Sequence, residues 1–231
     1  MPNENVLDVG CGLGNLTMDI AEIAKGGLVL GIDTSPPMIE EAKKNLLSRR
    51  LSNVSFQQKR VTELQLDNLF DVVFSNSVLH WIKDQENTLQ AIHRCLKAER
   101  RIGLQFPLLD TSHPLVALTQ EAIHLLQLGC RYTAWQFPWF VPESSDAYAD
   151  LLCNALFKKV SVRKQTTSYE FASASTAYGF FCSVGFDLFL QPLSPEEGVS
   201  LKEKVLSLLT SRAVENRVRL DFCRLYVLAK S

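Results

Sequence analysis

The stretch "VLDVGCGLGN", residues 6–15, decides the fold. Residues 6–9 are apolar except for Asp8, which is typical of a short buried strand. Glycines at positions 10, 12 and 14 follow, and an amphipathic stretch begins at Asn15. A strand, a glycine turn and a helix in this order are typical of a nucleotide-like cofactor site at the carboxyl end of a parallel strand.

Strands and helices alternate through the first hundred residues. Apolar strands are predicted at residues 6–9, 28–32, 54–58, 70–75 and 101–106, and helices at 15–24, 35–47 and 86–96. In the first helix, Leu16, Ile20, Ile23 and Ala24 are expected to share the buried face. The alternation predicts an α/β fold with a doubly wound, mostly parallel sheet.

The second half of the chain has a different pattern. Helices are predicted at residues 112–128, 145–156, 173–184 and 195–210, and strands at 160–171 and 219–230. The two late strands bring the sheet to seven. No linker rich in proline, glycine or serine divides the sequence, so residues 1–231 are expected to form a single domain. Residues 107–158 are interpreted as a helical cap, inserted after the fifth strand, that binds the acceptor.

Composition excludes several classes of function. The net charge of −1, from 24 basic and 25 acidic residues, provides no strong field for nucleic acid or an anionic membrane. The six cysteines lack paired spacing and the four histidines lack metal-ligand spacing, so neither a disulfide framework nor a metal site is expected. The sequence contains neither a recognisable signal peptide nor an apolar run long enough to span a membrane, so a cytoplasmic protein is predicted. The oligomeric state is left open.

The spacing of the glycines distinguishes between two cofactors. Dinucleotide sites carry G-x-G-x-x-G, whereas here the third glycine comes one residue early. Asp8 lies two residues before the first glycine, where a carboxylate would repel a pyrophosphate but suit an ammonium and a sulfonium. S-adenosylmethionine carries both groups. Asp33, at the end of the second strand, can accept ribose hydroxyls and fits either cofactor.

Three motifs carry a resemblance to a known family. "VLDVGCGLGNLT", "GIDTSPPMIEEAKKN" and "FDVVFSNSVLHWI" resemble, in order and spacing over residues 6–106, the motifs of class I S-adenosylmethionine-dependent methyltransferases. The stretch after the fourth strand is most similar to carboxyl methyltransferases of small molecules, the group of the trans-aconitate, malonyl-carrier-protein and juvenile hormone acid enzymes. The resemblance implies a Rossmann-like fold and methylation of a small or lipophilic acid.

The resemblance also implies which residues bind the cofactor. The implied set is Asp8, Gly10 and Gly12 at the methionine end, Gly14 in the same turn, Asp33 at the ribose, Thr34 and Met38 near the adenine, and Asn76 at the end of the fourth strand. Two departures from the family stand out. Arg60 occupies the position of an acidic residue that accepts from the adenine amino group, leaving Glu63, Gln58 or a backbone carbonyl as substitutes. Residues 1–5 cannot supply the helices that usually precede the first strand.

The acceptor side is assigned to two clusters. His80 and Trp81 follow the fourth strand and are the candidate catalytic residues, although His80 also suits a polar loop and Trp81 the core. Arg131, Tyr132 and Trp135 are the candidate substrate-binding residues, with packing of the cap as the alternative. A carboxylate acceptor is already ionised at neutral pH, so a catalytic dyad is not required.

Two other hypotheses remain open at this stage. One is an N-terminally truncated, weak or inactive protein of this fold that only binds ligand, which Arg60 and the short N-terminus motivate. The other is a nicotinamide-dependent oxidoreductase, which the glycine spacing and Asp8 disfavour.

Overall fold

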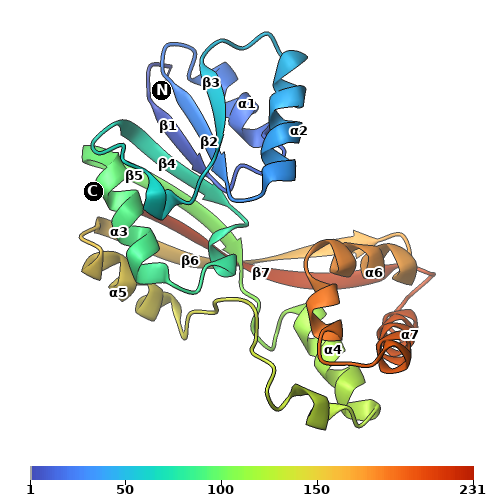
Figure 1. The fold of residues 1–231 in the computed structure, drawn as a ribbon. Helices are drawn as coiled ribbons and strands as arrows, with labels where there is room; N and C mark the ends of the chain where they lie inside the picture. Colours follow the sequence, from blue (N-terminus) through green and yellow to red (C-terminus); the bar gives the residue numbers. More distant parts are fainter. Residues whose placement is uncertain (1) are drawn as a thin grey trace. The chain divides into compact units, whose positions relative to one another are not determined.

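The computed structural model describes residues 2–231, and in these residues seven strands form one sheet in the order β3-β2-β1-β4-β5-β7-β6 (Figure 1). The strands are β1 (Val6–Val9), β2 (Val29–Asp33), β3 (Val54–Gln58), β4 (Phe70–Asn76), β5 (Leu96–Pro107), β6 (Lys158–Phe171) and β7 (Val218–Lys230). Strands β1 to β5 pair in parallel, and β7 runs antiparallel to β5. The predicted mostly parallel, seven-stranded α/β fold is confirmed.

Seven α-helices occur in the same residues: α1 (Asn15–Ile23), α2 (Pro36–Leu47), α3 (Gln85–Cys95), α4 (Pro114–Leu125), α5 (Ser145–Asn154), α6 (Ala174–Ser183) and α7 (Pro195–Ser211). Four short 3-10 helices accompany them: η1 (Val61–Glu63), η2 (Leu79–Trp81), η3 (Gly129–Tyr132) and η4 (Phe186–Leu190). The sequence predicted every one of the α-helices. None of the helices in the described part of the chain is long and apolar enough to cross a bilayer.

The chain divides into two compact units. The first contains the residues up to Pro107 together with Pro142–Lys164 and Arg224–Ser231, and the second contains Leu108–Val141 and Gln165–Cys223. These bounds differ from the expected insertion at residues 107–158, because α5 belongs to the first unit while α6 and α7 belong to the second. The difference arises because β6 and β7 each contribute residues to both units.

The first unit is built around the parallel strands. Met18 of α1, together with Ile39 and Ala42 of α2, packs on Val29 and Phe56 of the sheet in one buried cluster. Helix α3 packs against β4, β5 and α5. Since a parallel sheet is covered by its crossover helices, the carboxyl ends of the strands lie together at one edge, where the loops can form a site.

The buried face of α1 differs from the expected one. Leu16 and Ile23 are 46% and 69% exposed, whereas Thr17, Met18 and Ala21 are buried. On this face, beside the apolar contacts of Met18 and Ala21 with the core, the Thr17 hydroxyl donates a hydrogen bond of 2.6 Å to the Asp8 carboxylate. A buried carboxylate requires such a partner, so the helix turns its threonine toward the sheet.

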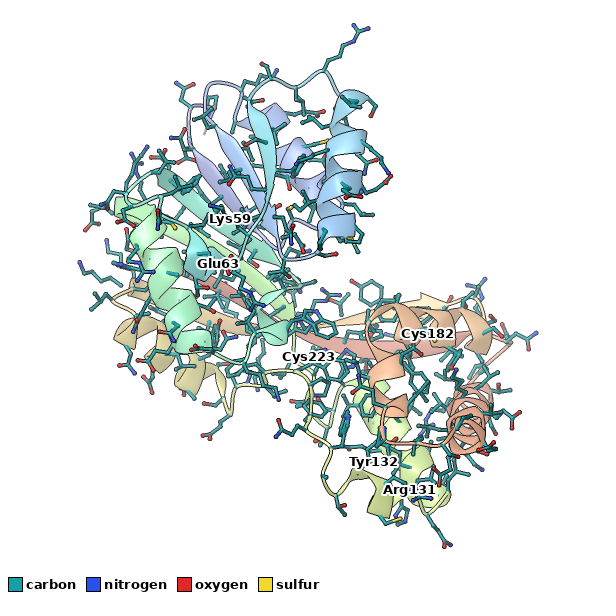
Figure 2. The ribbon with its side chains drawn as sticks, viewed as in Figure 1. Lys59, Glu63, Arg131, Tyr132, Cys182 and Cys223 are labelled. Carbon is teal, nitrogen blue, oxygen red and sulfur yellow. The ribbon has the colours of Figure 1, made fainter. Side chains whose placement is uncertain are left out.

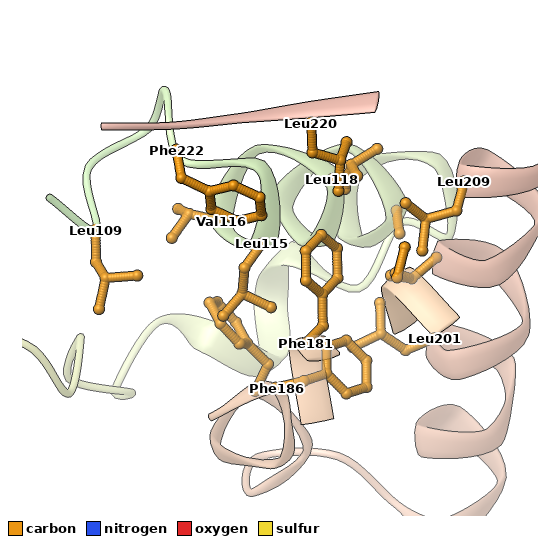
Figure 3. Close-up of a cluster of buried hydrophobic side chains, with 14 of the residues drawn as sticks. Leu109, Leu115, Val116, Leu118, Phe181, Phe186, Leu201, Leu209, Leu220 and Phe222 are labelled. Atoms are coloured by element: carbon orange, nitrogen blue, oxygen red, sulfur yellow. The ribbon is translucent and has the colours of Figure 1, made fainter. Parts of the chain in front are cut away.

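The second unit has its own apolar core. Figure 3 shows side chains of α4, α6, α7 and β7 gathered in one cluster, among them Leu115, Phe181, Leu201 and Phe222. At the start of β7, Val218, Leu220 and Phe222 are buried and alternate with exposed residues, so this face of the strand lies on the core.

Candidate active site

A cavity of about 770 Å³ lies at the carboxyl ends of β1, β2 and β4, in the first unit. Val9, Ile32 and Asn76 line it from the ends of the three strands, and the glycine turn and the segment around η2 complete its wall. The direction in which successive strands are added changes between β1 and β4, since β2 and β3 lie on one side of β1 and β4 and β5 on the other. An open parallel sheet binds its ligand at such a switch point, and the volume lies within the usual range for cofactor sites.

The three glycines of the turn have different roles. All have positive φ, 77° at Gly10, 53° at Gly12 and 78° at Gly14. A Cβ at Gly10 would lie 2.1 Å from Cγ2 of Val78, and one at Gly14 would lie 2.6 Å from the Phe56 ring, so these two glycines permit close packing. A Cβ at Gly12 would meet no protein atom within 4 Å. Gly12 lines the cavity, and its bare backbone leaves room for a ligand.

Asp33 fixes the turn from the end of β2. Its Oδ2 accepts from the Gly12 N–H at 3.0 Å, and its Oδ1 accepts from the Ser35 N–H at 2.9 Å. Each carboxylate oxygen still has a lone pair available for a hydroxyl. The side chain therefore shapes the cavity and can also accept hydrogen bonds from a ligand in it.

Asp8 lies one layer behind the turn, only 2% exposed and outside the residues that line the cavity. Burial raises the pKa of its carboxyl to about 6, and the negative charge of Asp33 adds to this effect. The hydrogen bond from Thr17 opposes the shift because it stabilises the ionised form. A nearby cation would lower the pKa again, so Asp8 is suited to a positively charged ligand.

The segment after β3 brings two cations to the cavity. Lys59, Arg60 and Thr62 line it, and Figure 2 labels Lys59 and Glu63 on this segment. The Glu63 carboxylate accepts from the Arg60 N–H at 3.1 Å and so closes the turn of η1. The Gln58 amide donates to the Thr34 carbonyl at 3.4 Å. Lys59 and Thr62 are cavity residues that the sequence analysis missed, because only the fold shows how η1 turns.

Residues 1–164 match the family model of the methyltransferase domain. The chain belongs to this methyltransferase family. Over 230 residues it is 28% identical to a trans-aconitate 2-methyltransferase of Methylobacterium nodulans, covering 97% of this chain and 86% of that one. The prediction of an S-adenosylmethionine-dependent methyltransferase is thereby confirmed.

Solved structures share the fold of this methyltransferase. The YcgJ protein of Bacillus subtilis superposes with a TM-score of 0.66 at 16% identity, over 100% of this chain and 92% of that chain. A Haemonchus contortus phosphoethanolamine N-methyltransferase 2, solved with S-adenosyl-L-methionine, has a TM-score of 0.60 at 17% identity. That likeness covers 99% of this chain and 49% of the other.

The methyltransferase brings most of the predicted cofactor residues to one cavity. Gly10, Gly12, Asp33, Thr34, Met38 and Asn76 all line it. Asp8 and Gly14 are not among the lining residues: the Asp8 carboxylate accepts from Thr17 of α1, and Gly14 packs closely against Phe56. The open backbone of Gly12, the remaining acceptor capacity of Asp33 and the buried carboxylate of Asp8 fit the hydroxyls and positive charges of S-adenosylmethionine.

The residues predicted for the acceptor separate in the methyltransferase. Trp81 lines the cavity and is 46% exposed, whereas His80 is buried beside it, with 5.2 Å between the ring centroids. Arg131 and Tyr132 lie in the second unit, where both are labelled in Figure 2. Arg131 forms an ion pair of 2.8 Å with Glu197. The Tyr132 hydroxyl donates to the Phe189 carbonyl at 2.5 Å.

Trp135 follows the same pattern. Its ring packs 5.1 Å from Phe189 and 5.4 Å from Tyr132, between centroids, within the apolar cluster of the second unit. Tyr132 and Trp135 therefore pack against the second unit's own cluster, whereas Arg131 is exposed. A direct contact of Arg131, Tyr132 or Trp135 with an acceptor stays a prediction.

Proposed function

We propose that this methyltransferase transfers the methyl group of S-adenosylmethionine to a carboxylate oxygen of a small organic acid. The observation that carries the proposal is the near full-length similarity to trans-aconitate 2-methyltransferase, which extends over 97% of the chain and so includes the second unit. If the similarity were confined to the cofactor-binding half, it would be equally expected of methyltransferases that act on many other kinds of acceptor. We place the enzyme in the cytoplasm, as the sequence analysis predicted.

The residues that would hold the cofactor follow from the cavity. Asp33 would accept from the ribose hydroxyls, Thr34 and Met38 would border the adenine, and the Gly12 backbone would let the cofactor approach the turn. Asp8 would compensate the positive charge of the cofactor from behind the turn. Bound S-adenosylmethionine supplies an electrophilic methyl group.

The adenine amino group needs a different partner in this chain from the family's acidic residue. Arg60 has no acceptor, and neither Glu63 nor Gln58 is among the residues that line the cavity. The Thr62 hydroxyl lines the cavity and has acceptor lone pairs. We assign the contact with the amino group to Thr62.

Methylation of a carboxylate needs no general base, which agrees with the residues that η2 contributes to the cavity wall. An acceptor oxygen attacks the methyl carbon, the O–C bond forms, and the electron pair of the broken C–S bond goes to sulfur. No proton moves, so the reaction needs alignment and exclusion of water more than a base. His80, the titratable residue of η2, is 4% exposed and lies outside the lining residues. Trp81 lines the cavity and would wall the acceptor.

A transfer assay tests the proposal. The purified chain is incubated with S-adenosylmethionine labelled in its methyl carbon and a panel of mono-, di- and tricarboxylic acids. We expect label in a product that releases methanol on mild base treatment, which is diagnostic of a methyl ester. The variant Asp33→Ala serves as the control that loses cofactor binding. Binding of NAD without binding of S-adenosylmethionine in calorimetry would contradict the proposal, and tight S-adenosylmethionine binding without transfer to any acid would favour a ligand-binding protein.

A further inference from the structure

A polar cluster of Ser77, Gln105 and Arg224 adjoins the cavity at the carboxyl ends of β4 and β5. Ser77 follows β4 and lines the cavity, Gln105 lies near the end of β5, and Arg224 pairs with Pro107 in the β5–β7 ladder. The Ser77 N–H donates to the Gln105 carbonyl at 2.7 Å. All three residues belong to the first unit. None of the three is among the site residues predicted from the sequence.

The cluster contains more hydrogen-bond donors than acceptors. The Ser77 hydroxyl donates to Oε1 of Gln105 at 3.3 Å and accepts from Nη1 of Arg224 at 3.4 Å. Gln105 is 9% exposed, and its Nε2 is buried without a partner, as is Nε of Arg224. Within residues 2–231, Arg224 makes no ion pair.

Unpaired donors of this kind point to an anionic ligand. A buried N–H group without an acceptor costs about 1–3 kcal/mol, so native proteins rarely leave one unless a ligand or water completes the bond. A guanidinium with a neighbouring amide N–H matches the two oxygens of a carboxylate. The cluster therefore has the chemistry of a carboxylate subsite.

The backbone at Ser77 supports a functional role. Its φ of 60° is uncommon for a residue other than glycine. Residues held in such a conformation concentrate at ligand sites, where the surrounding structure fixes them. Here the turn directs the Ser77 hydroxyl to Gln105 and Arg224, while Asn76 and Val78 on either side line the cavity. The subsite thus meets the cavity at the end of β4.

We propose that Arg224 and Gln105 bind a second, non-reacting carboxylate of the acceptor, so that the substrate is an acid with at least two carboxyl groups. The proposal rests on the proposed function. The reacting carboxylate loses its charge as the O–C bond forms, so a guanidinium bonded to it would stabilise the ground state more than the transition state. A carboxylate that keeps its charge throughout is stabilised by the guanidinium equally in the ground state and in the transition state. Its role is therefore to anchor the substrate.

Matched acids and matched variants test the subsite. Fumarate and crotonate differ in having a carboxylate or a methyl group at one end, and trans-aconitate adds a third carboxylate. For the unaltered chain we expect kcat/KM to be at least tenfold higher for fumarate and trans-aconitate than for crotonate. Arg224→Gln should raise the KM for the polycarboxylates about tenfold or more and abolish the preference over crotonate. Arg219→Gln, an exposed change on the same strand, should keep the preference.

A binding measurement separates this inference from the proposed function. Calorimetry of trans-aconitate with the chain saturated in S-adenosylhomocysteine requires no turnover, and S-adenosylhomocysteine binding itself shows that a variant is folded. We expect trans-aconitate binding to be lost in Arg224→Gln and partly retained in Arg224→Lys, which keeps the charge without the planar fork. Unchanged trans-aconitate binding in folded Arg224→Gln, or equal methylation of crotonate and fumarate, would overturn the subsite. Methylation of no acid, with Arg224-dependent binding intact, would overturn the proposed function alone.

Discussion

Gly12 is the residue at which the conformation of the turn and the space for the cofactor meet. Its φ is positive, and its missing side chain faces the cavity. In Gly10 and Gly14, by contrast, the same conformation serves packing against Val78 and Phe56. The sequence pattern marks all three glycines alike, so it could not tell that Gly12 is the one with open space beside its Cα.

Gly12→Ala is expected to weaken S-adenosylhomocysteine binding by about tenfold or more. A methyl group there would enter the cofactor's space, and a left-handed conformation costs an L-residue about 1–2 kcal/mol. Gly129→Ala is the control, because Gly129 also has nothing within 4 Å of an added Cβ but lies in the second unit. Calorimetry measures both variants. Wild-type affinity in Gly12→Ala would show that the cofactor does not approach the turn.

Asp8 gives cofactor binding a dependence on pH. Its pKa is about 6 in the free chain, so the carboxylate is mostly ionised at pH 7.5 and mostly protonated at pH 5. The ammonium group of S-adenosylhomocysteine favours the ionised form, so binding at low pH must release a proton. We expect the affinity to fall by about tenfold from pH 7.5 to pH 5, since one pH unit below the pKa costs about 1.4 kcal/mol. In Asp8→Asn the affinity should be weaker at pH 7.5 and nearly flat with pH. A wild-type profile in that variant would assign the titration to another group.

At the scale of single elements, the orientation of α1 shows where hydrophobic periodicity misleads. The predicted extent of the helix is close to the observed Asn15–Ile23, but the apolar residues Leu16 and Ile23 are exposed. The buried face is instead formed by Met18, Ala21 and Ala24, together with Thr17, which donates a hydrogen bond to Asp8. A periodicity analysis that counts only apolar residues cannot register such a bond.

Thr17→Val should destabilise the chain by about 1–3 kcal/mol at pH 7.5, because it leaves the ionised Asp8 carboxylate without its buried partner. Leu16→Ser, one position earlier on the same helix, should change the free energy of unfolding by no more than about 0.5 kcal/mol because Leu16 is exposed. Denaturant unfolding measures both. A larger loss of unfolding free energy in Leu16→Ser than in Thr17→Val would show that Leu16, and not Thr17, lies on the buried face of α1.

The other elements were largely predictable because their signals are local. The glycine turn, Pro36 and Pro37 in the first turn of α2, and alternating strand and helix patterns fixed most bounds within a few residues. Strand β5 is an exception: it begins at Leu96 rather than at residue 101, because the charged residues at its start do not resemble a buried strand.

At the scale of the whole molecule, long-range pairing could not be derived from the sequence. Arg224 is 147 positions from Ser77, and only the register of β7 on β5 brings the two together. Arg131 lies in a conspicuous aromatic stretch and drew the substrate assignment, yet its charge is paired with Glu197. An arginine becomes a strong candidate for a ligand when the fold leaves it without a carboxylate, and that is a property of the tertiary structure.

The division into two units leads to a prediction of separable effects. Leu201 is fully buried in the core of the second unit, so Leu201→Ala should lower the free energy of unfolding by about 2–5 kcal/mol. The cofactor cavity is lined by residues of the first unit alone, so the affinity for S-adenosylhomocysteine should stay within about twofold of wild type at a temperature where the variant is folded. A loss of affinity as large as the loss of stability would show that the cavity depends on the second core.

The most direct test of the function is the identity of the methylated product. The chain is incubated with S-adenosylmethionine carrying a ¹³C-labelled methyl group and with trans-aconitate, and the product is examined by ¹³C NMR and by its lability to base. The account predicts a methyl ester whose carbon is released as methanol. Label that is stable to base, or no transfer to any polycarboxylic acid by a chain that binds S-adenosylmethionine, would contradict carboxyl methylation.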